Sequence, residues 1–169
     1  MLFVWIGIIA VILIVAVLIG AYIVYRMAFG RNDKFIGGPD EMPDTPFYTP
    51  YEEMLKKNID IFLKIPCEEV YTTSYDGLKL HAKFYKGEEN KPVLIFFHGY
   101  RANATRDGSG IHTLGAVKGI NILVVTQRAH KESEGRTITF GIRESKDCLS
   151  WIDYVKERFG EDKKVILKL

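Results

Sequence analysis

Apolar residues fall into one long run near the start of the chain and several short runs further on. Residues 1–25 contain no Asp, Glu, Lys or Arg and are almost entirely aliphatic, aromatic or glycine. A helix of this length covers about 36 Å, because each residue adds about 1.5 Å, and a hydrocarbon core is about 30 Å thick. The pattern therefore predicts a transmembrane helix over residues 1–26.

A secretory signal peptide is the main alternative for this segment. Such a peptide has a basic first region, an apolar stretch of roughly 7–15 residues and a small-residue cleavage site. Here no Lys or Arg precedes the apolar run, and the hydrophobicity continues past Gly20 and Ala21. Arg26, Arg31 and Lys34 follow it, so the positive-inside tendency predicts a single-pass protein of the cell membrane whose remaining residues are cytoplasmic.

An amphipathic helix is expected after a linker. Residues 27–48 are rich in Gly, Pro and acidic side chains, which disfavour regular structure. Thr49, Pro50 and Glu52 predict a capping box at a helix start, and Pro66 ends the helix. We expect the helix to pack on the domain, and the alternative is a helix lying on the membrane surface. Its expected inner face comprises Tyr51, Met54, Leu55, Asn58, Ile59, Phe62 and Ile65.

A hairpin is predicted next. Residues 70–73 are rich in β-forming side chains, Asp76-Gly77 is a tight-turn sequence, and residues 78–85 alternate apolar with polar. One apolar and one polar face is typical of antiparallel strands near the edge of a sheet. His81 falls on the polar face, so we expect an ordinary surface histidine.

Three unbroken apolar runs predict a second kind of strand. They cover residues 93–97, 120–125 and the segment that begins at Lys164, and such runs are typical of parallel strands buried on both faces. Helical patterns separate them, at 109–118 and at about 142–159. The expected core face of the second helix is Leu149, Ile152, Val155 and Phe159. Alternating strands and helices predict an α/β fold with a doubly wound sheet.

Charge and cysteine content narrow the function classes. The formal net charge is +2 with basic and acidic residues interleaved, so no nucleic-acid partner is expected. Cys67 and Cys148 are far apart and lack metal-ligand spacing, so we expect no metal or other cofactor. Cys148 falls on the apolar side of the last helix, which favours a buried thiol over a disulfide.

The segment with the clearest chemical meaning is His98-Gly99-Tyr100, directly after the first buried strand. In acyl-transfer enzymes of α/β type, a loop in this place offers backbone N–H groups to the carbonyl oxygen that becomes negative. The alternative is a structural turn with a hydrogen-bonded histidine. These residues alone leave both interpretations open.

Five stretches of the sequence resemble the bacterial membrane-anchored α/β-hydrolases of the serine aminopeptidase-like group. They are residues 71–81, 97–103, 127–135, 139–141 and 147–154. The resemblance implies a membrane anchor, a Pro-rich linker, and hydrolysis of a small ester, amide or peptide substrate by a Ser-Asp/Glu-His triad.

The resemblance also implies roles for single residues. The backbone N–H of Tyr100 would be an oxyanion donor, with His98 and Gly99 shaping the loop. Arg128 and His130 would lie near the edge of the site, although a structural role in their loop is the favoured interpretation. The family usually has Asp and Gly where this sequence has Thr126 and Lys131, and we expect Lys131 to strain a turn. These site residues are His98, Gly99, Tyr100, Arg128 and His130.

The family's catalytic triad is not found in these residues. Its Gly-x-Ser-x-Gly elbow follows the third parallel strand, where this sequence reaches Leu169. Ser109, Ser133, Ser145 and Ser150 lack the elbow's spacing or position. The expected fold class is therefore α/β: an incomplete α/β-hydrolase sheet, with an N-terminal hairpin plus three parallel strands and crossover helices over residues 49–169, preceded by one transmembrane helix.

Three functions remain open at this stage. The preferred one is the N-terminal part of a membrane-anchored serine hydrolase, inactive as this chain. The second is a non-catalytic membrane-anchored remnant or partner-binding protein. The third is a different catalytic device built from His98, His130, Asp107 and Glu132.

Overall fold

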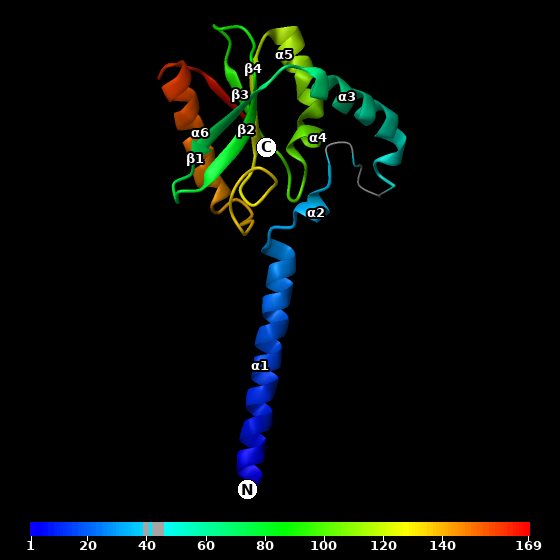
Figure 1. Cartoon of the computed structure of the whole chain (residues 1–169), viewed down its shortest axis with the longest axis vertical. Coiled ribbons are helices and arrows are strands. Elements are labelled where there is room, and N and C mark those ends of the chain that lie inside the picture. The colour runs from blue at the N-terminus through cyan, green and yellow to red at the C-terminus, as the bar shows by residue number, and fades with distance from the viewer. Residues whose placement is uncertain (39–40, 42–45) are drawn as a thin grey trace. The chain divides into compact units, whose positions relative to one another are not determined.

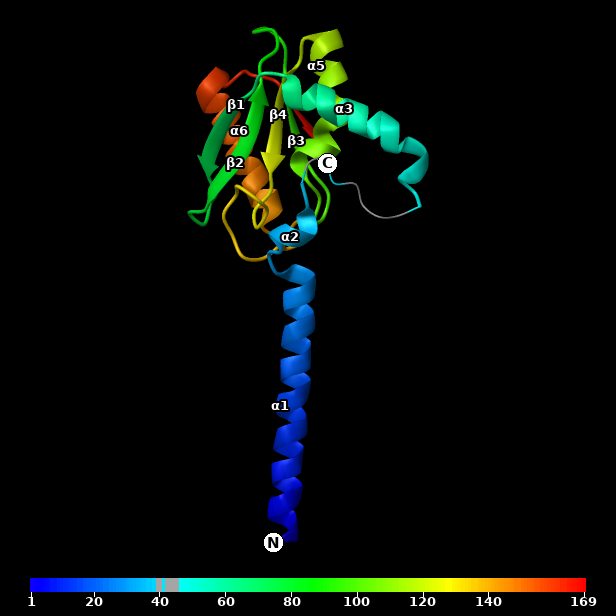
Figure 2. The same ribbon diagram turned by 45° about the vertical axis from the view of Figure 1, so that its right-hand side comes forward.

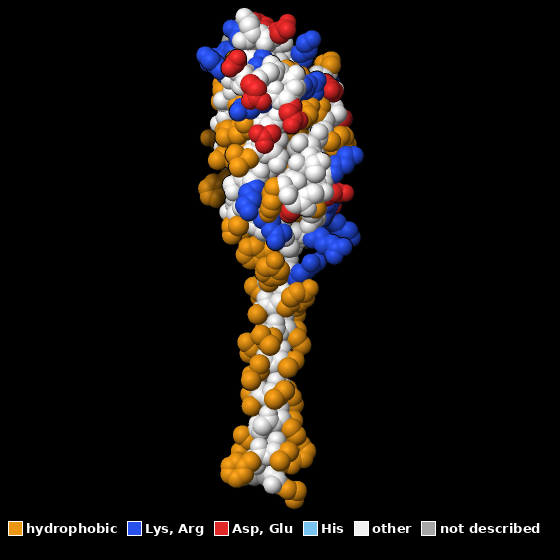
Figure 3. Space-filling model, turned by 90° about the vertical axis from the view of Figure 1, so that its left-hand side faces the viewer, with side chains coloured by type: hydrophobic (Ala, Val, Ile, Leu, Met, Phe, Trp, Pro, Cys, Tyr) orange, Lys and Arg blue, Asp and Glu red, His pale blue; other side chains and the backbone are white. Residues whose placement is uncertain are grey.

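A computed structural model describes residues 1–38, 41 and 46–169. The chain divides into two compact units, residues 1–30 and residues 31–169. The first unit is the helix α1 (Leu2–Phe29) (Figure 1). Within Phe3–Phe29, an 18-residue window has a mean hydropathy of 3.1, and this segment is long and apolar enough to cross a membrane by length and composition. Apolar side chains cover it on the face that Figure 3 shows. Residues 39, 40 and 42–45 of the predicted linker lie outside the described residues.

The second unit begins with helical segments. These are α2 (Asp33–Ile36), the 3-10 turn η1 (Thr49–Tyr51) and α3 (Glu52–Lys64). The predicted capping box is wrong: the 3-10 turn separates Thr49 from the α-helix, and neither element has a side-chain cap.

The inner face of α3 is narrower than predicted. Ile59 and Phe62 are buried, whereas Tyr51 and Met54 are 57% and 55% exposed. The Phe62 ring stacks on Tyr85 of the sheet, with 4.6 Å between the ring centroids. This contact confirms that the helix packs on the domain.

Five strands form one mixed sheet (Figure 2). They are β1 (Glu68–Thr73), β2 (Lys79–Tyr85), β3 (Val93–Phe97), β4 (Asn121–Thr126) and β5 (Val165–Lys168), in the order β1-β2-β4-β3-β5. β2 is antiparallel to β1 and β4, whereas β3 is parallel to β4 and β5. The predicted edge hairpin and three parallel strands are confirmed.

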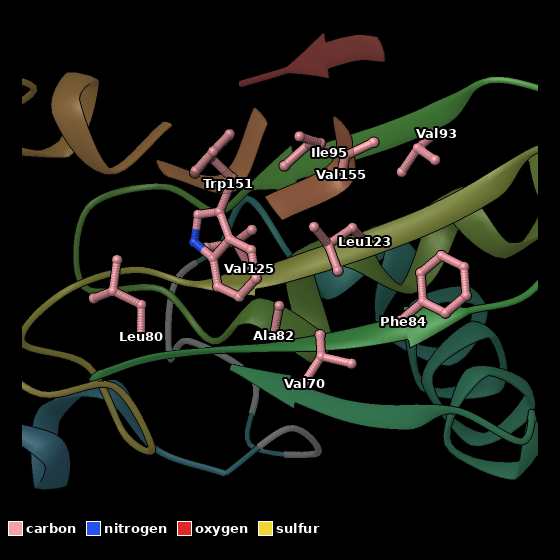
Figure 4. Packing of buried hydrophobic residues seen from close by; sticks show 11 residues of the cluster. Val70, Leu80, Ala82, Phe84, Val93, Ile95, Leu123, Val125, Trp151 and Val155 are labelled. Atoms are coloured by element: carbon pink, nitrogen blue, oxygen red, sulfur yellow. The ribbon is translucent and has the colours of Figure 1, made fainter. Parts of the chain in front are cut away.

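Helix α6 (Glu144–Phe159) covers one face of this sheet. Trp151 and Val155 are fully buried, and in Figure 4 the Trp151 indole lies over Val125. The predicted core face is wrong at Leu149, which is 60% exposed, and it missed Trp151. The helix starts later than predicted because the Glu144 carboxylate accepts the backbone N–H groups of the preceding loop.

The opposite face is covered by α3 and by the connection between β3 and β4. This connection contains α4 (Ala104–Gly108), η2 (Ser109–Ile111) and α5 (His112–Lys118). Its helical structure begins earlier than predicted, because Asn103 caps α4 by accepting N–H bonds from Thr105 and Arg106. Helices therefore pack on both faces of the sheet, as a doubly wound fold requires. The apolar cluster on this face is Phe62, Tyr85, Leu94, Phe96, Ile111, Ile122 and Val124.

The prediction for His81 is wrong. Its side chain is 1% exposed, and Nδ1 lies 2.9 Å from the Thr126 hydroxyl while Nε2 contacts the Glu69 carboxylate. The backbone N–H of His81 donates to Ser133 Oγ at 2.9 Å. A loop from far along the sequence therefore covers the polar face of β2, which local alternation cannot reveal.

Candidate functional site

The carboxyl ends of β3 and β4 carry the two loops of interest. The β3 loop (residues 98–103) leads into α4 on one face of the sheet, and the β4 loop (residues 127–136) leads to α6 on the other. β3 lies between β4 and β5 in the sheet. The β3–β4 connection runs over one face, and the β4–β5 connection, which contains α6, runs over the other. Open α/β sheets bind ligands at such a switch point, beyond the carboxyl ends of the strands.

His98 joins these two loops. Its Nδ1 lies 2.8 Å from the carbonyl oxygen of Gly99, and its Nε2 accepts the backbone N–H of Gln127 at 3.1 Å. The Gln127 side-chain amide in turn donates to the carbonyl of His98. A carbonyl oxygen only accepts, so Nδ1 carries the proton and both ring nitrogens are occupied.

Burial, reinforced by the neighbouring His130, lowers the pKa of His98 to about 3. The ring is therefore neutral at physiological pH. It acts as a hydrogen-bonded brace for the β3 loop and is not placed as a catalytic base.

The β3 loop turns through Arg101, which has a φ of +52°. The Ala102 N–H closes the turn on the carbonyl of Gly99 at 3.2 Å, and the Gly99 N–H points to the Asp107 carboxylate at 3.3 Å. A Cβ on Gly99 would meet only ordinary contacts, at 3.8 Å or more. The positive φ of this turn therefore lies at Arg101, and the backbone of Gly99 does not require glycine.

Tyr100 lies at the surface of this loop. Its ring is 47% exposed and stacks on Phe140, with 4.7 Å between centroids. Its role as a backbone oxyanion donor stays a prediction.

His130 meets His98 at the base of the two loops. The rings are in edge contact with centroids 4.6 Å apart, and His130 Nδ1 lies 2.8 Å from the carbonyl of Arg128. Burial lowers the pKa of His130. Its Nε2 is buried and has no hydrogen-bond partner among the described residues. Both histidines line a cavity of about 200 Å³, together with Ala102, Asn103 and Thr126.

Arg128 is a structural residue of the β4 loop. Its guanidinium donates twice to Asp147 of α6, at 2.6 Å each, and twice to Asp76 of the β1–β2 turn, at 3.0 Å each. The side chain is 1% exposed. The hydrogen bonds from Arg128 lower the pKa of Asp76 to about 2. Arg128 thus joins three segments, as the favoured interpretation expected.

Backbone strain in the β4 loop is compensated by further bonds. Ala129 and Lys131 have φ values of +60° and +38°, which non-glycine residues rarely adopt. The Lys131 N–H donates to Asp33 at 3.1 Å, and its Nζ donates to the Asp33 carbonyl at 3.0 Å. The turn that the sequence predicted to be strained at Lys131 is therefore held by the segment after α1.

The described serines and acids of this unit take part in other contacts and do not form the alternative catalytic device considered from the sequence. Ser133 is buried and donates its hydroxyl to the Thr126 carbonyl at 2.5 Å. Asp107 bonds the Gly99 N–H, and Glu132 lies 3.8 Å from His81. Within residues 1–38, 41 and 46–169, no serine hydroxyl is hydrogen-bonded to a histidine ring. Of the four residues proposed for such a device, His98 and His130 are in ring contact and Glu132 lines the same cavity, but among the described residues no hydrogen bond joins these three side chains to one another.

Sequence reasoning missed the partners that position this site. Gln127 and Asp147 appeared only within family-like stretches, and neither was assigned a role. A polar residue directly after a buried strand is a usable signal for Gln127, since such residues meet at one sheet edge. Asp147 stands on the inner face of α6, one position before the half-buried Cys148, and a buried carboxylate there requires a cationic partner.

Comparison with known proteins places this geometry in context. No family model matches the chain. The curated thiohydrolase aneE of Aspergillus aculeatus is 29% identical over 100 residues, which are 58% of this chain and 31% of that protein. The esterase Pf2001 of Pyrococcus furiosus has a TM-score of 0.53 at 23% identity, covering 66% of this chain and 42% of the esterase. The α/β-hydrolase GrgF of Penicillium sp. sh18 has a TM-score of 0.51 at 22% identity, covering 59% and 34%.

These likenesses concern the fold. The chain spans less than half the length of each of these relatives. Its globular unit has a partial α/β-hydrolase fold, with the hairpin, the parallel strands and helices on both faces as the sequence predicted.

Proposed function

We propose that residues 31–169 form the oxyanion side of a serine hydrolase that cleaves esters, thioesters or amides. The observation that carries the proposal is the bracing of the β3 loop by His98 at the switch point of the sheet. Both ring nitrogens of His98 are used to hold backbone, so the loop is rigid before any substrate arrives. Preorganised N–H donors are what an oxyanion requires, because they need not reorient during the reaction.

In this proposal each part of the β3 loop has a defined role. The N–H of Tyr100 donates to the oxyanion that forms when a nucleophile adds to the substrate carbonyl. His98 and His130 hold that loop and take no proton. Thioesters are included among the proposed substrates because the chain is similar to a thiohydrolase, and esters because it is similar to an esterase. The finer resemblance, to serine aminopeptidase-like hydrolases, rests on the sequence stretches given above.

The nucleophile is the part of the mechanism that these residues do not supply. Residues 1–169 contain no Gly-x-Ser-x-Gly sequence. In α/β-hydrolases that elbow follows the strand in the position of β5, and the acid and histidine come later in the chain. We therefore expect residues 1–169 alone to be inactive, and the triad to come from sequence that continues β5.

The proposal includes a membrane anchor. Helix α1 is apolar over a length sufficient to span a bilayer, and Arg26, Arg31 and Lys34 follow its apolar run. The positive-inside tendency then favours a single-pass protein with residues 31–169 in the cytoplasm.

A labelling experiment tests the catalytic proposal. The 169-residue chain and a version extended by the downstream reading frame are purified in detergent and treated with a fluorophosphonate probe. We expect no label on the first, and one labelled serine within a Gly-x-Ser-x-Gly sequence on the second. An extended chain that contains no elbow and takes no label would contradict the proposal.

A non-catalytic, partner-binding role is the second candidate, and the exposure of β5 favours it. Ile166 and Leu167 are 41% and 48% exposed on the edge strand of the described sheet. An apolar edge of this kind pairs readily with another strand. Stable co-purification of the 169-residue chain with another protein, combined with an unlabelled extended chain, would support this role.

A further inference from the structure

We propose that the globular unit carries a binding site for the phosphate of an anionic lipid headgroup, in a hollow lined by arginines. The hollow has a volume of about 580 Å³, and its walls include Arg31, Arg128, Arg136, Arg143, Asp76 and Glu134. All of these residues belong to residues 31–169. The inference rests on the proposed membrane anchor, and it is independent of the proposed hydrolysis.

Hydrogen bonds tie the hollow to the segment that follows the anchor. The Arg31 N–H donates to the carbonyl of Arg136 at 2.9 Å, and its guanidinium donates to the carbonyls of Ser133, at 2.7 Å, and Lys131. In the sequence, Arg31 comes two residues after the last residue of α1. The β4 loop is therefore bound to a residue that must lie close to the bilayer surface if α1 spans the membrane.

Two of the guanidinium groups are available to a ligand. Arg31 is paired with Asp33 at 2.7 Å, and Arg128 is saturated by its two carboxylates. Arg136 and Arg143 are exposed, and no carboxylate pairs with either among the residues that the structure describes. Arginine binds phosphate through a planar fork of N–H donors, which suits a lipid phosphodiester.

Of the two acidic residues in the hollow, Asp76 is paired with Arg128, and Glu134 accepts a backbone hydrogen bond but keeps its charge. Asp76 accepts from Arg128 and from the Ser74 hydroxyl, and Glu134 accepts the backbone N–H of Lys79 at 2.8 Å. Several Lys and Arg side chains lie close together on the face of the globular unit that Figure 3 shows. This distribution favours an anionic surface as partner, since each Lys or Arg near such a surface contributes about 1 kcal/mol of attraction.

Native mass spectrometry of the full chain in detergent tests the site. Phosphatidylglycerol and phosphatidylcholine are titrated in parallel, and we expect tighter binding of phosphatidylglycerol. The Arg136→Gln/Arg143→Gln variant should lose roughly fivefold in affinity for each arginine removed. A matched control, Lys57→Gln/Lys118→Gln, removes the same charge from exposed positions on α3 and α5 and should bind as the unaltered chain does.

Two further measurements identify the source of the phosphate and distinguish a failure of the headgroup site from a failure of the membrane anchor. Millimolar inorganic phosphate should leave lipid binding unchanged, and displacement of the lipid would show a soluble-phosphate site instead. Equal affinities for the two lipids, or equal losses in the two double variants, would overturn the headgroup site. If alkaline carbonate extracts the chain from membranes, the proposed membrane anchor is contradicted. If the chain stays in the membrane but shows no lipid preference, only the headgroup site is contradicted.

Discussion

The β3 loop and the β4 loop lie at the same edge of the sheet but are built in opposite ways. The β4 loop buries Arg128, His130 and Ser133. Arg128 and Ser133 are hydrogen-bonded to other segments, and His130 is hydrogen-bonded to the Arg128 carbonyl within the loop. The β3 loop buries His98 and Asn103, which hold the loop and cap α4, but it leaves Tyr100 half exposed. Side chains that a fold needs for stability are enclosed and paired, whereas a loop that meets a ligand must leave atoms accessible. Under the proposed function, the β4 loop serves as scaffold and the β3 loop offers the accessible atoms.

The largest expected effect is the removal of Arg128. An Arg128→Ala variant leaves Asp76 and Asp147 without their partner, which should cost about 3–5 kcal/mol of unfolding free energy. Urea denaturation of the full chain in detergent, followed by Trp151 fluorescence in a Trp5→Phe background, measures it. Arg143→Ala is the matched control and should change stability by less than about 0.5 kcal/mol. Equal effects of the two variants would contradict the scaffolding role.

A fall in pH should weaken the contact between the two loops. The pKa values of His98 and His130 are lowered in the folded chain, so unfolded chains bind more protons and stability is lost as pH falls below about 6.5. Each histidine contributes up to about 1.4 kcal/mol per pH unit in that range. The urea midpoint should therefore drop between pH 7 and pH 5. A flat profile would show that these histidines are solvated.

Replacing His98 should cost less than replacing Arg128. A His98→Leu variant leaves the Gln127 N–H without its acceptor, which should cost about 1–3 kcal/mol. The pH dependence of its urea midpoint should also be shallower than that of the unaltered chain. A fully retained pH slope would assign the proton uptake to other groups.

The smallest expected effect is at Tyr100. A Tyr100→Ala variant loses one ring stack at the surface, which should cost no more than about 1.5 kcal/mol. Tyr100→Phe keeps the stack on Phe140 and should therefore lose less stability than Tyr100→Ala. A loss as large as that of Arg128→Ala would place the β3 loop in the scaffold as well.

The sequence predicted the parts of the fold that depend on local pattern. Residues 93–97 form a strand with the predicted bounds, because an apolar run buried on both faces needs no information from elsewhere. His81 and Trp151 were misjudged or missed, because their burial depends on the β4 loop and on the docking of α6. The pairing of Arg128 with Asp76 and Asp147 joins positions far apart in the sequence, which one sequence cannot reveal.

The place of β3 in the sheet has a consequence for synthesis on the ribosome. Val93 pairs with Asn121 on one side and with Val165 on the other, so the two neighbours of β3 are translated at very different times. The hairpin of β1 and β2 can close early, but β3 must wait for β5 with one apolar edge open. Such an interval favours association with other nascent chains. Chaperones that bind nascent polypeptides should therefore protect this chain from aggregation mainly between the translation of β4 and that of β5.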